Sequence, residues 1–139
     1  MSAPMKASLV IVSTLTCLSI SLPSLAEIQR NWIHITTNNL GDRVMLDLNS
    51  IRVRNQRRIR QVDFTTTTYY SSPDPDGVAG TLTSFTAGCL TDSLGVSRFT
   101  TYDSNNQIVD DFKPWTGFQS VQSGSVGGRL YEYSCQHLR

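Results

Sequence analysis

Several residue types that support catalysis, metal binding or nucleic-acid binding are scarce in this chain. Its 139 residues include only three cysteines and two histidines, with no Cys-x-x-Cys pair. Two distant histidines without a nearby cluster of Cys, Asp or Glu do not form a metal site, so we predict no metal and no cofactor. An excess of one charge is also lacking, since 12 Lys and Arg face 11 Asp and Glu. This balance argues against nucleic-acid binding, which depends on excess positive charge.

Complete catalytic motifs are lacking as well. Gly124-Ser125-Val126-Gly127 is not a nucleophile elbow, because the residue two before Ser125 is serine rather than glycine. Asp74-Pro75-Asp76-Gly77 starts like a calcium-binding loop, but no acidic residue closes a twelve-residue loop after it. We therefore expect a protein that is not an enzyme.

Residues 1–26 have the layout of a secretory signal peptide. Lys6 precedes an apolar stretch over 9–20, and small residues stand before a predicted cleavage site after Ala26. The stretch is short for a membrane span, and no second long apolar run follows. We expect 27–139 to form one exported domain that is periplasmic, at the cell surface or secreted.

The three cysteines predict one disulfide. Cys17 lies inside the predicted signal peptide, which leaves Cys89 and Cys135 in the exported domain. An even number of cysteines in an oxidising compartment favours a bond between them, which would stabilise the fold by about 4 kcal/mol through loop closure. Two free, buried thiols are the alternative.

The exported domain has a period of two in its hydrophobic residues, which predicts β-strands. Loop residues such as Pro73, Asp74 and Gly77 interrupt the pattern, and the connections are short, as in an antiparallel meander. The predicted strands cover 31–35, 44–48, 51–53, 59–70, 82–90, 96–102 and 107–109.

The end of the chain predicts a helix. Ser123-Gly124-Ser125 offers an N-cap, and Val126, Leu130, Tyr133 and His137 follow at helical spacing. We therefore predict a β-rich α+β fold with an antiparallel sheet of about six strands. We expect the Cys89–Cys135 disulfide to tie one C-terminal helix to this sheet.

Five arginines within nine residues form the strongest candidate contact surface: Arg52, Arg54, Arg57, Arg58 and Arg60. A three-residue hairpin loop at Asn55-Gln56-Arg57 would place Arg54 opposite Arg58, Arg52 opposite Arg60 and Val53 opposite Ile59. Four guanidinium groups would then share one face, which suits an acidic polysaccharide, a lipid phosphate or an acidic protein. The alternative is a solvated strand face whose charges pair with Asp42, Asp63, Asp110 or Asp111.

Two aromatic residues in the irregular stretch after 112 are a second candidate site. Trp115 and Phe118 lie where no regular strand is predicted. They either fold back on the core, as most aromatic side chains of so small a domain should, or rim a groove between sheet and helix that would take a flat apolar ligand or a partner peptide.

In order and spacing, several short motifs resemble the surface-adhesin protein E-like domains of bacterial envelopes. These motifs are Trp32, Leu46-Asp47-Leu48-Asn49-Ser50-Ile51, Cys89, Tyr102, Ile108-Val109, Trp115, and Gly124-Ser125-Val126-Gly127 leading to Cys135. The resemblance implies an antiparallel sheet with a tethered C-terminal helix. It also implies a surface or periplasmic binding role, since the named adhesin binds host matrix proteins. The chain departs from the family in lacking a lipidation box before Cys17 and in having Asn105-Asn106 where a glycine turn is usual.

These observations together predict an exported, envelope-associated, non-enzymatic binding module of 27–139. Its partner would be an extracytoplasmic protein or an acidic polysaccharide, and no motif fixes an oligomeric state. The alternatives are a structural or accessory periplasmic domain, and a binder of a small apolar ligand in the groove near Trp115.

Overall fold

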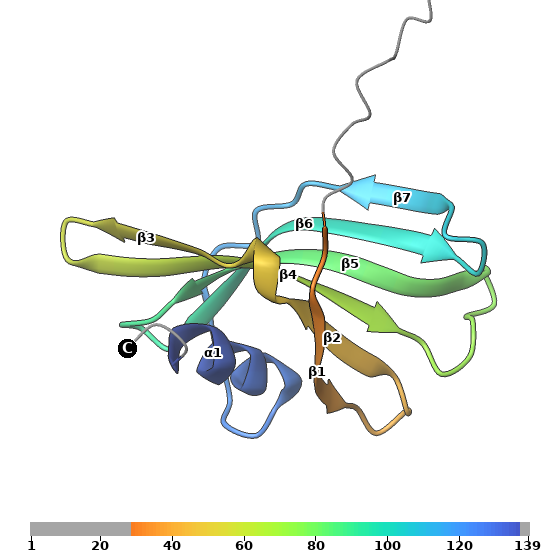
Figure 1. Cartoon of the computed structure of the whole chain (residues 1–139), viewed down its shortest axis with the longest axis horizontal. Coiled ribbons are helices and arrows are strands. Elements are labelled where there is room, and N and C mark those ends of the chain that lie inside the picture. The colour runs from red at the N-terminus through yellow and green to blue at the C-terminus, as the bar shows by residue number, and fades with distance from the viewer. Residues whose placement is uncertain (1–28, 137–139) are drawn as a thin grey trace, which may run out of the picture.

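The computed structural model describes residues 29–136, so the predicted signal peptide and His137 lie outside the described residues. An antiparallel sheet of eight strands curves around one α-helix near the end of the chain (Figure 1). The elements in chain order are β1 (Trp32–Thr37), β2 (Arg43–Asp47), the short 3-10 helix η1 (Leu48–Ser50), β3 (Arg52–Gln56), β4 (Ile59–Tyr69), β5 (Val78–Gly88), β6 (Ser93–Asp103), β7 (Ile108–Phe112), β8 (Gln119–Ser120) and α1 (Val126–Gln136).

The sheet is a meander, as the alternating sequence pattern predicts. The main path runs β1-β2-β4-β5-β6-β7, with β3 paired to β4 and β8 paired to β6, and every pair is antiparallel. The β-rich α+β fold with a tethered C-terminal helix is confirmed. The strand number is eight rather than about six: the seven predicted ranges each overlap one strand, and the short β8 forms inside the stretch predicted to be irregular.

The longest strands, β4, β5 and β6, carry many threonines, whose branched side chains suit a pleated surface. β5 begins at Val78, before its predicted start, and includes Gly80 in its ladder with β4 and β6. A Cβ at Gly80 would clash with the ring of Tyr102. Glycine here marks a close approach of a side chain to the strand, which an alternation pattern does not reveal.

β2 and β3 occupy successive parts of the same edge of β4, with η1 between them. β2 pairs with β4 at its end, over Thr66 to Tyr69, and β3 pairs with its beginning. At the interruption the Ser50 hydroxyl accepts a hydrogen bond from the Thr65 amide at 2.8 Å. The buried carboxylate of Asp47 caps η1 by accepting from the Asn49 amide at 3.0 Å. Side-chain oxygens thus satisfy the backbone where the ladder is broken.

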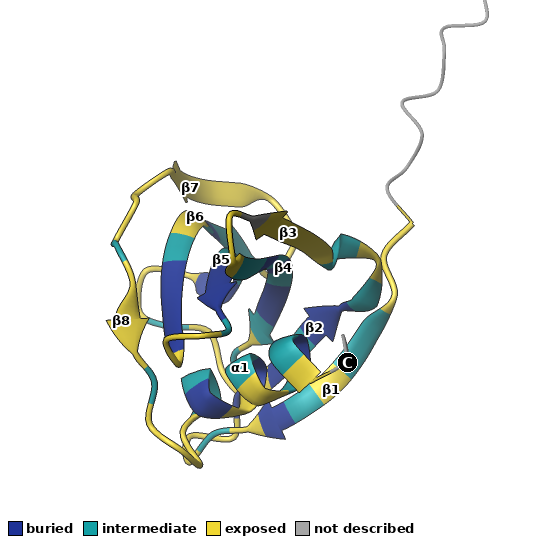
Figure 2. Ribbon diagram, turned by 90° about the vertical axis from the view of Figure 1, so that its left-hand side faces the viewer, coloured by how far each residue is buried: buried dark blue, intermediate teal, exposed yellow. Residues whose placement is uncertain are grey.

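The two faces of the sheet differ in character. The inner face, toward α1, carries the apolar core, and in Figure 2 buried segments of the strands surround the helix. The outer face carries the alternate residues of the same strands, among them Gln61, Asp63 and Thr65 of β4 and Ser84 and Thr86 of β5. The buried core side chains are Val44, Leu46, Val62, Phe64, Ala87, Leu94 and Leu130 of α1.

The start of α1 agrees with its predicted cap. The Ser125 hydroxyl accepts from the Gly128 amide at 3.0 Å and donates to the Gln122 carbonyl at 2.6 Å. Gly128 weakens a helix by about 1 kcal/mol relative to alanine. A Cβ there would clash with the Gln122 carbonyl oxygen, so this glycine permits the close approach of the preceding loop.

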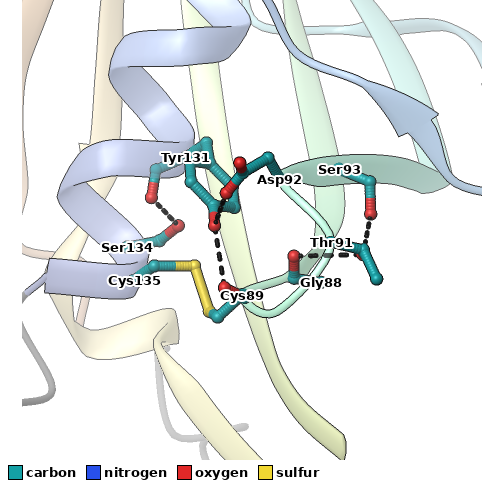
Figure 3. The surroundings of a disulfide bond; sticks show 8 residues. All are labelled: Gly88, Cys89, Thr91, Asp92, Ser93, Tyr131, Ser134 and Cys135. Atoms are coloured by element: carbon teal, nitrogen blue, oxygen red, sulfur yellow. Dashed lines mark hydrogen bonds between the residues drawn. A yellow bond between two sulfur atoms is a disulfide. The ribbon is translucent and has the colours of Figure 1, made fainter.

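The predicted disulfide between Cys89 and Cys135 is present, with Cα atoms 5.6 Å apart (Figure 3). It joins the last turn of α1 to the loop after β5. The Tyr131 hydroxyl, one helical turn earlier, lies 2.9 Å from the Cys89 carbonyl oxygen and 2.6 Å from the Asp92 carboxylate. The bond and these polar contacts together hold the helix against the sheet.

None of the helices within 29–136 has the length and apolar character needed to cross a membrane.

Candidate functional site

The clustered arginines lie on the hairpin of β3 and β4, and the end of this hairpin projects beyond the rest of the sheet (Figure 1). Its loop has two residues, Arg57 and Arg58, with φ values of 44° and 75°. A two-residue loop with positive φ at both positions matches the twist of the flanking strands. Asparagine and glycine are the usual residues there, because a left-handed backbone costs other residues about 1–2 kcal/mol.

The predicted register of this hairpin is wrong. Gln56 pairs with Ile59, and Arg54 pairs with Gln61 rather than with Arg58. The two-residue loop starts two residues later than predicted, and the partner of Val53 shifts by three residues, from the exposed Ile59 to the fully buried Val62. Because side chains alternate between the two faces of a strand, a register shift by an odd number of residues puts the side chains of β4 on the opposite face, relative to β3, from the one predicted.

The predicted stack of four guanidinium groups therefore does not form. Arg52 and Arg54 lie on the outer face, whereas Arg60, half-buried, alternates with Val62 on the inner face. Arg52 donates to the Asn49 and Ile51 carbonyls, both at 2.9 Å. The exposed tip keeps only Arg57 and Arg58, which we call the arginine tip.

Arg54 takes part in an ion pair that the alternative interpretation anticipated. Its Nε lies 2.7 Å from Oδ2 of Asp63, and its Nη2 donates to Oδ1 at 2.8 Å. The Thr86 hydroxyl also donates to Oδ1, at 2.7 Å. Two parallel hydrogen bonds of this kind hold the guanidinium and the carboxylate in one plane. Asp63 therefore compensates the positive charge of Arg54.

A cleft of about 640 Å³ opens on the outer face beside this ion pair. We call it the outer cleft; it has a charged wall, an aromatic wall and a floor of hydroxyl groups. Its lining includes Ser50, Arg54, Gln61, Asp63, Thr65, Ser84, Thr86, Ser97, Trp115 and Phe118. The structure thus brings one residue of the arginine cluster together with both predicted groove aromatics.

The aromatic wall is not where the sequence prediction placed it. Trp115 lies against Gly95, where a Cβ would stand 2.7 Å from the indole ring. Gly95 pairs with Thr86, whereas its neighbour Leu94 belongs to the inner core. The indole is therefore on the side of the sheet away from α1. A separate groove of about 380 Å³ between sheet and helix is lined by Leu94, Val121 and Gly127 among others, and neither Trp115 nor Phe118 lines it.

Two hydrogen bonds fix the segment that carries the indole. The Val96 amide donates to the Thr116 hydroxyl at 3.0 Å, and the Thr116 amide donates to the Val96 carbonyl at 3.2 Å. Trp115 and Phe118 meet edge to face, with ring centroids 5.3 Å apart, and remain 57% and 43% exposed. The two rings form a fixed wall that still presents a large apolar area to the cleft.

The strongest pKa shifts lie outside the cleft. Hydrogen bonds from Arg98 and Thr100 lower the pKa of Asp111 to about 2. Burial and the hydrogen bond with Asp92 raise the pKa of Tyr131 to about 12. The first group ties β6 to β7 and the second ties α1 to the sheet, so both shifts belong to structural contacts.

Metal-binding groups do not gather in the described part of the chain: it holds no cluster of three or more His, Cys, Asp or Glu. His34 is exposed in β1, with its Nε2 2.9 Å from the Thr37 hydroxyl. In the outer cleft the one carboxylate, Asp63, is engaged by Arg54 and Thr86. The arrangement offers hydrogen bonds and an apolar wall to a ligand.

Comparisons of the chain with protein-family models, with curated proteins and with solved structures find no match. The resemblance to the surface-adhesin protein E-like family stays a prediction from the residues.

Sequence reasoning missed Asp63, Thr86 and Gly95 as parts of one site. They come from three neighbouring strands, and only the register of the ladder places them side by side. One signal was present in the sequence, since a glycine inside a strand often marks a close approach by another group.

Proposed function

We propose that this protein is an exported, envelope-associated, non-enzymatic binding module whose arginine tip contacts an acidic partner outside the cytoplasm. The observation that carries the proposal is the pair of arginines at both positions of a left-handed two-residue turn. Strained backbone of this kind is found often at functional sites, where the residues serve binding rather than stability.

The charges at the tip favour an acidic partner. Arg57 and Arg58 are exposed and adjacent at the projecting end of the hairpin, while Arg54 is neutralised by Asp63. Exposed Val53 and Ile59 add apolar area near the tip. Guanidinium groups bind carboxylate and sulfate or phosphate oxygens through paired hydrogen bonds, as acidic polysaccharides and acidic protein patches offer.

Export is supported by the signal-peptide pattern of residues 1–26, and the disulfide is compatible with an oxidising compartment. The resemblance to the surface-adhesin protein E-like domains points the same way, toward a surface or periplasmic binding role.

The test compares the protein with a variant carrying Arg57→Asn and Arg58→Gly on immobilised heparin across a salt series. Because asparagine and glycine suit a left-handed turn, we expect the free energy of unfolding, measured by urea denaturation, to rise by about 1 kcal/mol in this variant. Salt-sensitive retention should be lost in the same variant. Arg129→Gln, which removes one exposed arginine from α1, is the control and should reduce retention little.

The alternative is a structural or accessory periplasmic domain. It predicts the same gain in stability and no change in retention. Absence of retention of the original protein at low salt would also contradict an acidic partner for the tip.

A further inference from the structure

The outer cleft offers an apolar wall and a polar wall to the same ligand. Trp115 rests on the bare backbone of Gly95, and the rest of the indole is open to the cleft. Two hydrogen bonds join Thr116 to the backbone of Val96 and fix the segment that carries Trp115. The indole is therefore already in place before a ligand binds. A preorganised aromatic surface loses little conformational entropy on binding.

The polar wall has hydrogen-bonding capacity left over. A guanidinium carries five N–H donors, and the contacts with Asp63 use two of those on Arg54. The side chains of Arg54 and Asp63 remain 47% and 36% exposed, so donors and acceptors stand side by side at the cleft. Hydroxyl groups of Thr65 and Ser84 continue this polar surface across the floor.

These features disfavour two other ligand classes. A wholly apolar ligand would cover the ion pair and the hydroxyl groups without bonding them, which costs free energy for each unsatisfied group. An anionic ligand would approach Arg54 beside the carboxylate of Asp63, which already occupies the guanidinium and repels negative charge. The ligand that fits is uncharged, with an apolar face and many hydroxyl groups.

We propose that the outer cleft binds an uncharged glycan segment. A sugar ring stacks its C–H face on Trp115, and its hydroxyl groups bond to the Arg54–Asp63 pair, donating to the carboxylate and accepting from the guanidinium. The cleft volume of about 640 Å³ lies within the range of ligand sites in proteins. This site is separate from the arginine tip and does not depend on the acidic partner proposed above.

The test uses the protein carrying Trp32→Phe, so that Trp115 is the only remaining tryptophan of the two. Short neutral oligomers of glucose, mannose and N-acetylglucosamine are titrated, with a polyuronate and naphthol as charged and apolar probes. Tryptophan emission and calorimetry report binding. We expect saturable binding of at least one neutral oligomer, with an affinity that changes less than about twofold between low and high salt.

Matched variants locate the binding. Trp115→Ala should weaken it by at least about tenfold, measured by calorimetry. Gly95→Ala should weaken it too, because the added Cβ displaces the indole without removing it. Phe112→Ala removes a 50% exposed aromatic that does not line the cleft and should leave affinity unchanged. Circular dichroism checks that each variant is folded.

Three results would overturn the proposal. One is the absence of any emission or heat change with every neutral oligomer. Another is binding of the polyuronate or of naphthol in the cleft with no neutral oligomer bound. The third is neutral-oligomer binding that Trp115→Ala and Gly95→Ala leave unchanged. Loss of heparin retention on changing Arg57 and Arg58 bears on the tip alone, so the two proposals can fail separately.

Discussion

Removing the disulfide should reduce the stability of this fold by about 4 kcal/mol. Cys89 and Cys135 are 46 residues apart, and the loop-closure entropy for that separation is about 13–14 cal/mol/K, or about 4 kcal/mol at 25 °C. Small domains are stable by only 5–15 kcal/mol in general, so the bond supplies a large share. Its contribution is greatest for α1, whose 11 residues include Gly127 and Gly128 and would be marginal alone.

The assay is urea unfolding of the oxidised protein and of a variant carrying Cys89→Ala and Cys135→Ala. With a denaturant dependence of about 1.5 kcal/mol per molar urea, the midpoint should fall by about 2–3 M. Hydrogen exchange should show the amides of α1 losing protection before those of β4 and β5. The original protein under reducing conditions is the control and should match the variant. A midpoint that moves by less than about 0.5 M would refute the loop-entropy reasoning.

Three further outcomes follow from single side chains. Leu130→Ala, at a 2% exposed core position, should cost about 2–5 kcal/mol in urea unfolding. Because the pKa of Asp111 falls from 3.8 to about 2 in the fold, the stability advantage over Asp111→Asn should be full above pH 4 and vanish as pH falls through 2, measured by thermal unfolding. Because the pKa of Tyr131 rises from 10.0 to about 12, the advantage over Tyr131→Phe should hold below pH 10 and shrink toward pH 12 in the same assay.

The fold was predictable because its determinants are local. The alternation of apolar and polar residues predicted most of the strands. Ser125 indicated the start of α1, and the number of cysteines predicted the Cys89–Cys135 bond. Each of these signals lies within a few residues or in a simple count. The short β8 was missed because two residues give no period, and its pairing with β6 depends on tertiary contacts.

The hairpin register was not predictable in the same way. Arg57 and Arg58 lack the asparagine or glycine that announces a two-residue turn, so a three-residue loop looked equally acceptable. The deciding contribution is the pairing of Val53 with Val62, and Val62 is buried by residues far away in the sequence. Tertiary burial therefore overrode the local preference at the turn.

The candidate site shows the same limit more strongly. Trp115 and Arg54 were recognised separately, as an aromatic in an irregular stretch and as one of a charge cluster. Their meeting in one cleft depends on the ladder that sets Asp63 beside Thr86 and Thr86 beside Gly95. A one-residue change in either register would place these side chains on opposite faces.

One ion pair separates the two proposed binding surfaces in their charge. Without Asp63, Arg54 would extend the positive charge of the tip along β3 to the outer cleft, and both surfaces would favour the same anions. With Asp63 held by Arg54 and Thr86, the cleft is neutral while Arg57 and Arg58 stay charged a few residues away. Arg54 lies at the base of the hairpin, because its partner Gln61 is also the first residue of β4 that pairs with β5. Its positive charge is therefore neutralised where the projecting strand pair joins the rest of the sheet. The same hairpin can therefore present an anion-binding end and an uncharged cleft, because the carboxylate of Asp63 on the neighbouring strand neutralises Arg54, the arginine of the cluster that lines the cleft.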